Sequence, residues 1–124
     1  MTRILVLLAA ALFINTALAQ DDSEEYVVVL PEDAQKCILP ASPDAIPEEA
    51  TLDQLKAAKA DIAVFQGEVA VFRECLDVAQ DNPSNTEGNK QAIISSFNYS
   101  VENEERVAER FNAAIRSYKE RNAK

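Results

Sequence analysis

The most regular pattern of hydrophobic positions in the chain runs through residues 51–81. Thr51, followed three residues later by Gln54, forms the capping-box pair that starts a helix, and no proline interrupts the segment. Its apolar residues recur at alternating steps of three and four: Leu55, Ala58, Ile62, Phe65, Val69, Phe72, Leu76 and Ala79. This repeat is typical of a helix that packs along its whole length against a partner helix.

A second segment, residues 90–120, has the same repeat with one acidic exception. The positions are Ile94, Phe97, Val101, Glu104, Ala108, Phe111, Ile115 and Tyr118. Between the two segments, residues 81–89 include Asn82-Pro83 and Gly88, a composition typical of a loop. Because two helices joined by so short a loop must lie antiparallel, the sequence predicts an all-α fold, a long coiled-coil-like two-helix hairpin.

The hairpin also has a predicted register. Folding it about the loop places side by side those residues whose numbers sum to about 173. Phe65 then lies beside Ala108, and Phe72 lies beside Val101. Large residues face smaller ones at these layers, which is the arrangement that close packing requires.

One flank of the predicted hairpin is too apolar to face water. It carries Val64, Val71, Cys75 and Val78 from the first helix, and Ile93, Val107 and Ala114 from the second. Before the first helix, residues 37–47 contain Pro40, Pro43 and Pro47, which exclude a helix and favour an extended course. This segment, the proline arm, also supplies Ile38, Leu39 and Ile46. We therefore expect the proline arm to run back along the apolar flank and cover it.

The two cysteines of the chain are placed to fasten the proline arm. Cys75 lies roughly 36 Å along the first helix from Thr51, and the stretch from Cys37 to Thr51 spans roughly 43 Å when extended. We expect an intramolecular Cys37–Cys75 disulfide, and the alternative is pairing between two chains. Closing this loop within one chain stabilises a fold by about 3 to 4 kcal/mol on the chain-entropy estimate.

The N-terminal residues have the layout of a secretory signal peptide. Arg3 precedes an apolar run that ends near Ala17-Leu18-Ala19, so cleavage is expected after residue 19. The run is too short to anchor the chain in a membrane. Residues 20–36 then form an acidic N-terminal segment in which residues 26–30 are either a short extended element packed on the domain or a frayed end. Export would place both cysteines in an oxidising compartment, periplasmic or extracellular.

The charge of the chain limits its partners. It has 12 basic and 21 acidic residues and a net charge of −9, which repels nucleic-acid phosphates and anionic lipid headgroups. We therefore expect no nucleic acid as a partner and no membrane insertion once the signal peptide is removed.

Little in the sequence indicates catalytic chemistry. The chain contains no histidine, both cysteines are assigned to the disulfide, and its two glycines form no phosphate-binding loop. Glu104 occupies a seam position, where the expected role is a polar break that fixes register. The acidic run around it alternates with Arg106 and Arg110, so surface ion pairs are expected before a calcium site. We expect no enzyme activity, no cofactor and no metal.

Several residues together resemble a group of known proteins. They are Cys37 before a proline arm ending in Ile46-Pro47, the stretch Phe72-Arg73-Glu74-Cys75-Leu76, and the final helical stretch from Phe111 to Lys119. This combination, over about residues 37–120, resembles small exported helical proteins of Gram-negative bacteria. The resemblance implies a periplasmic or secreted setting and carries no activity. Within it, Asn112, Arg116 and Tyr118 are the candidates for a common task.

Two functions fit these features. The first is a non-enzymatic interaction or structural module of the cell envelope that binds a protein partner or itself. Its candidate surface comprises Val64, Val71, Val78, Ile93, Val107, Asn112, Arg116 and Tyr118. The alternative is a carrier that holds a small apolar ligand between the hairpin and the proline arm.

Overall fold

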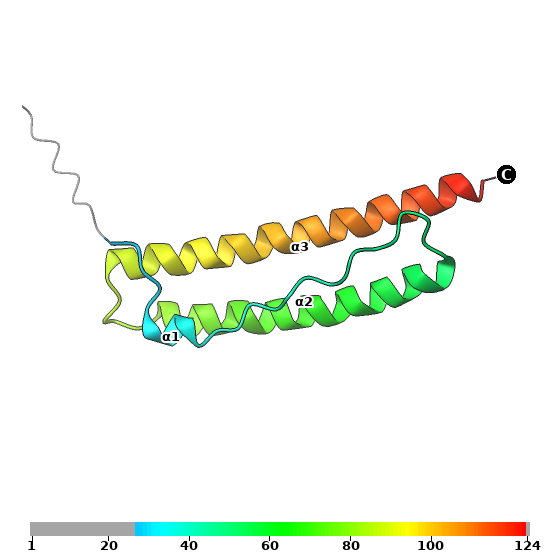
Figure 1. Ribbon diagram of the computed structural model, residues 1–124. Coiled ribbons are helices and arrows are strands. Elements are labelled where there is room, and N and C mark those ends of the chain that lie inside the picture. Colours follow the sequence, from blue (N-terminus) through cyan, green and yellow to red (C-terminus); the bar gives the residue numbers. More distant parts are fainter. Residues whose placement is uncertain (1–26, 124) are drawn as a thin grey trace, which may run out of the picture.

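Two long antiparallel helices form the body of the protein. The computed structural model describes residues 27–123, in which the elements are α1 (Glu32–Gln35), α2 (Leu52–Gln80) and α3 (Glu87–Arg121), with no strand in this range. Figure 1 shows α2 and α3 side by side, with the chain before α2 running along them. The all-α hairpin is therefore confirmed. The predicted signal peptide and Tyr26 lie outside the described residues.

Both long helices begin at a capping box. The Thr51 side chain accepts a hydrogen bond from the Gln54 backbone N–H, and the Gln54 side chain accepts one from the Thr51 N–H, as predicted. Thr86 and Asn89 form the same reciprocal pair. This second cap lies in the segment predicted as a loop, so α3 starts three residues earlier than the predicted residue 90. Asparagine at the third position of the helix replaces the usual glutamate or glutamine, which hides the signal in the sequence.

The core follows the predicted register. One buried cluster consists of Ala34, Phe72, Leu76, Ala79 and Ile93, and a second consists of Phe65, Val69 and Val107. A side-chain hydrogen bond from Arg73 to Ser100 lies on the same register, with a donor–acceptor distance of 2.9 Å. The clusters bury residues of α2 at the predicted seam positions, because that face points towards α3.

The buried face of α3 is rotated from its predicted position. Ile93, Ser100, Asn103 and Val107 are buried, whereas the predicted seam residue Ile94 is 45 % exposed. The cause is a third layer, because α1 and the proline arm lie over this side of α3. Ala34 of α1 packs into the cluster with Ile93, and Ser42 of the arm lies 3.1 Å from Asn103, Oγ to Oδ1.

Glu104 is the polar break expected in the seam, and its partner is Arg73. The two side chains form an ion pair at 2.7 Å and are each about three-quarters buried. The Arg73 guanidinium also stacks over the Phe97 ring at 5.6 Å. The Arg73 side chain is therefore mostly buried, because it is long enough to reach across to α3.

Residues 27–37 close the loop end of the hairpin. Asn89 donates to the carbonyl of Val29, and the Val27 carbonyl packs directly against Gly88. Because a Cβ at Gly88 would overlap that carbonyl, the contact requires glycine at this position. The described part of the segment thus packs on the domain as extended chain followed by the single turn α1, which its sequence did not predict.

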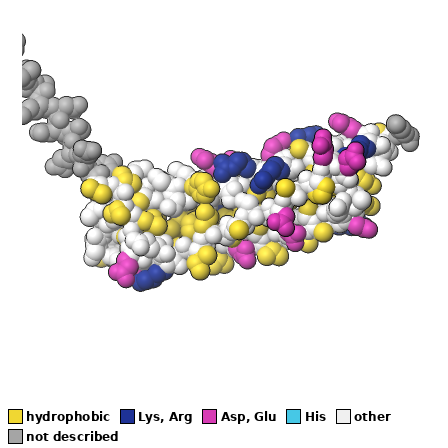
Figure 2. Space-filling view, in the orientation of Figure 1, with side chains coloured by type: hydrophobic (Ala, Val, Ile, Leu, Met, Phe, Trp, Pro, Cys, Tyr) yellow, Lys and Arg dark blue, Asp and Glu magenta, His cyan; other side chains and the backbone are white. Residues whose placement is uncertain are grey.

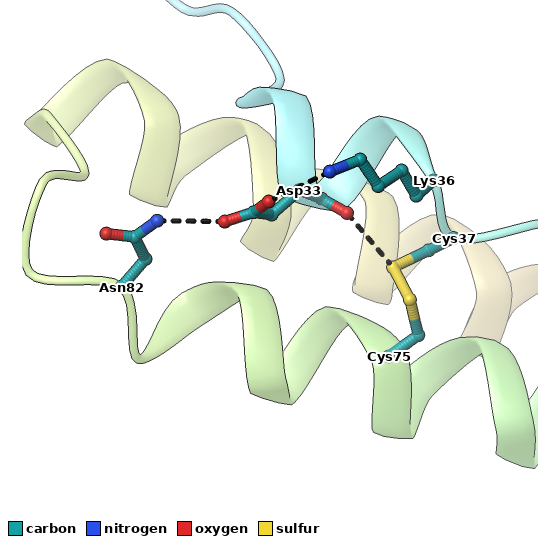
Figure 3. Close-up of polar contacts among 5 residues, drawn as sticks. All are labelled: Asp33, Lys36, Cys37, Cys75 and Asn82. Atoms are coloured by element: carbon teal, nitrogen blue, oxygen red, sulfur yellow. Dashed lines mark hydrogen bonds and ion pairs between the residues drawn. A yellow bond between two sulfur atoms is a disulfide. The ribbon is translucent and has the colours of Figure 1, made fainter.

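The disulfide joins this end to α2. Cys37 and Cys75 are bonded within the one chain, with Cα atoms 5.6 Å apart. Figure 3 shows Asp33, one turn before Cys37, between two polar partners: Asn82 donates to it at 2.9 Å, and Lys36 lies 3.3 Å away. The expected intramolecular pairing is confirmed.

These partners lower the pKa of the Asp33 carboxyl below its ordinary value of 3.8, the Asn82 hydrogen bond contributing most. A pKa that is lower in the folded state contributes stability above the unfolded-state value, and this stability is lost as the pH falls through the folded-state value. The contact between α1 and the α2–α3 loop is therefore weakest in acid.

The proline arm crosses from one helix to the other. Near its start, Ile38 and Pro40 lie beside Val71 of α2. From Ser42 onwards it follows α3, and Ile46 lies against Val107. The residues that follow it are fixed by the Arg121 guanidinium, which donates to the carbonyls of Glu48 and Ala50 at 2.9 and 2.8 Å.

This path differs from the expected one. The arm does not cover the α2 valines, since Val64, Val71 and Val78 remain 63, 66 and 71 % exposed, and Ile38 is 83 % exposed. By moving to α3 at Ser42, the arm buries the Val107 side of the hairpin instead.

Candidate interaction surface

Three valines spaced seven residues apart form an exposed apolar row on α2. Val64, Val71 and Val78 lie on the same side of the helix because seven residues make almost two turns. Exposed small residues lie around them, namely Ala60, Ala63, Gly67 and Ala70, and so do two exposed glutamates, Glu68 and Glu74. We call the three valines, with these small residues and Ala57, the valine face. Figure 2 shows hydrophobic side chains reaching the surface along the α2 edge of the molecule.

The valine face points away from the core. The buried residues of α2 are Leu55, Phe65, Val69, Phe72, Leu76 and Ala79. The valines fall on the opposite side of the helix, at the third position of each heptad, where a solvated helix usually carries charged residues. An exposed row of valines is therefore unexplained by the folding of a single chain.

The remaining predicted surface residues divide into two groups. Ile93 and Val107 are buried in the two core clusters, so they are not available to a partner. Asn112 and Arg116 are exposed on α3, and Arg116 pairs with Glu109 at 2.8 Å. Tyr118 is partly buried. The structure thus leaves the valines as the apolar part of the predicted surface, on a different helix from the polar candidates.

Three glutamates of the acidic run of α3 form ion pairs, whereas Glu105 and the expected partner Arg110 form none among residues 27–123. Glu102 lies 3.9 Å from Arg106, Glu104 pairs with Arg73, and Glu109 pairs with Arg116. Within residues 27–123, no three acidic, cysteine or histidine side chains converge in a geometry suited to a metal ion. In the same part of the chain, no helix is long and apolar enough to span a membrane.

Shallow grooves lie on both sides of the hairpin. One is lined by Ala45, Ile46 and Pro47 of the proline arm together with α3 residues. The α3 side consists of Arg110, Ala113, Ala114 and Ser117. This groove is mainly apolar, with Glu48 and Arg110 as the charged residues of its lining, and it is one of the grooves where a ligand could contact both arm and hairpin.

Comparisons of the chain with known protein families, with curated proteins and with solved structures found no match.

Proposed function

We propose that the protein is an exported, non-enzymatic interaction module that binds a protein partner through the valine face of α2. The observation that carries the proposal is the exposure of Val64, Val71 and Val78, each more than 60 % accessible. Burial of apolar surface stabilises an interface by roughly 25 cal/mol per Å². A row of valines on a rigid helix offers such surface without any cost of ordering a loop.

The proposed setting is an oxidising compartment outside the cytoplasm. The Cys37–Cys75 disulfide supports it, because disulfides persist where thiols are not kept reduced. The acidic composition of the chain supports solubility there. In this setting the Cys37–Cys75 disulfide holds α1 and the proline arm on the hairpin, and the valine face of α2 remains exposed.

Site-specific photo-cross-linking in the host cell tests the proposal. A photoreactive residue placed at Val71 is expected to trap a protein adduct, and the same residue at Glu102, which is exposed on α3, is expected to trap little. Equal adduct formation at the two positions, or none at Val71, would show that the valine face is not a binding surface.

A carrier function is the second candidate, and the groove between the proline arm and α3 favours it. The apolar lining from Ile46 and Ala113 fits a small apolar molecule. Native mass spectrometry of protein purified from its host tests this function. A bound mass that disappears in the Ala113→Glu variant supports a carrier, and an unliganded spectrum rejects it.

A further inference from the structure

We infer that a groove between α2 and α3 binds a small primary amine with an aliphatic body, whose ammonium group is held at Asp77. The residues that line the groove come from both helices: Asp77, Gln80, Ile93, Ile94, Phe97 and Asn98. None of them belongs to the valine face or to the proline arm. The inference therefore adds a site to the proposed function and does not depend on it.

The floor of the groove is apolar and partly open. Ile93 is buried, Phe97 is partly buried, and Ile94 is 45 % exposed. The rotation of α3 that buries Ile93 leaves Ile94 at the surface, where it lines this groove. The space measures about 290 Å³, close to the lower end of the range of small-molecule sites. A short aliphatic chain therefore fits the floor.

The polar side chains of the groove offer oxygen acceptors. The Asp77 carboxylate only accepts hydrogen bonds, and the amide oxygens of Gln80 and Asn98 accept them as well. Gln80 Oε1 is buried and has no hydrogen-bond partner among residues 27–123, which is destabilising. The terminal torsion of glutamine is soft, so the amide can turn this oxygen towards a donor in the groove. An ammonium group, with three donors and no acceptor, complements these oxygens.

The charge around the groove favours a cation. Asp77 is exposed and forms no ion pair among the described residues. The basic residues of adjacent turns are paired elsewhere, since Arg73 binds Glu104 at 2.7 Å and Lys90 binds Glu87 at 3.0 Å. The net charge of −9 also attracts cations and repels carboxylates. An amine is therefore expected to bind more tightly than an acid or an alcohol with the same body.

A titration with hexylamine tests the site. The full chain, labelled with nitrogen-15 and with its disulfide intact, is followed by NMR at pH 7 and low salt, where the amine is protonated. Chemical-shift changes are expected to concentrate at Asp77, Ile94 and Phe97, with a dissociation constant on the order of 1 mM or tighter. Hexanoate, which has an aliphatic body but the opposite charge, is expected to bind about tenfold or more weakly.

Two substitutions separate the polar and the apolar parts of the site. Asp77→Asn is expected to weaken hexylamine about fivefold or more and to change the affinity for hexanol by less than about twofold. Ile94→Ser is expected to weaken both ligands alike, because it removes apolar surface from the floor. Both positions are exposed, so each melting temperature is expected to stay within about 2 °C of the native value.

Glu68→Gln is the matched control for Asp77→Asn. It also removes one exposed carboxylate from α2, but Glu68 lines a different groove, beside Ile38 and Val71. Its effect on the hexylamine affinity is expected to be less than about twofold. Equal weakening by the two substitutions would mean that the amine responds only to the overall charge of the chain, which overturns the site.

Two further results overturn the inference. One is hexanoate binding as tightly as hexylamine, and the other is a titration whose shift changes are absent or spread evenly over the surface. The proposed function is tested separately, because the cross-linking position Val71 does not line this groove. An adduct at Val71 without amine binding rejects this site alone, and amine binding without an adduct rejects the valine face alone.

Discussion

A chain in which both cysteines are replaced by serine is expected to unfold about 15 °C below the native chain. The Cys37–Cys75 bond closes a 38-residue loop that includes the proline arm and most of α2. Without the bond the unfolded chain gains conformational entropy, so the free energy of unfolding falls by about 3 kcal/mol. In a domain of this size, each kcal/mol lowers the melting temperature by about 4 to 8 °C.

Circular dichroism at 222 nm during heating measures this shift. The double variant is preferable to a single one, because a lone cysteine could join two chains. The native chain treated with a reductant provides the matched control and is expected to melt at the same temperature as the variant. A melting temperature unchanged in both samples would show that the bond does not constrain the fold.

Leu76→Ala is expected to lower the free energy of unfolding by about 3 kcal/mol. Leu76 is fully buried in the cluster where α1, α2 and α3 meet, so its removal leaves a cavity against Phe72 and Ile93. The neighbouring side chains are held by the disulfide and by two long helices, which limits how far the structure can collapse into the space. Chemical denaturation followed by circular dichroism measures the loss.

Leu52→Ala is the control for that substitution. Leu52 belongs to the same helix and loses the same atoms, but it is 48 % exposed at the first turn. Its replacement is expected to change the free energy of unfolding by about 0.5 kcal/mol or less. Similar losses for the two variants would mean that the three elements do not share a core at Leu76.

The sequence was sufficient to predict the features that depend on local or repeating signals. The two helices follow from the three-and-four repeat and from the Thr51–Gln54 cap. The register follows because one short loop joins the two helices and so fixes which residues lie opposite each other. The Arg73–Ser100 hydrogen bond agrees with this register. The disulfide follows from the length of chain between Cys37 and α2.

The features that were not predicted depend on contacts between distant segments. The one-turn helix α1 is fixed by Ala34 in the core and by the Asp33–Asn82 hydrogen bond, and neither leaves a periodic signal. The path of the proline arm depends on contacts with Asn103 and Arg121 of α3, made by the arm and by the residues that follow it. A hydrophobic pattern identifies an apolar flank, but it does not show which part of that flank a flexible segment will cover.

The path of the proline arm determines which residues of the predicted apolar flank remain exposed. Sequence reasoning placed the α2 valines and Val107 on one flank, to be covered together by the arm. In the structure the arm covers Val107 and leaves Val64, Val71 and Val78 exposed. The exposed row was therefore found through the position of the arm, although each valine was already a candidate.

A non-reducing peptide map of protein purified from its host shows whether the arm is fastened across the hairpin within one chain. One linked pair of peptides, containing Cys37 and Cys75, is expected from protein in which no free thiol is detected. Free thiols at both positions, or a bond between Cys37 residues of two chains, would contradict it.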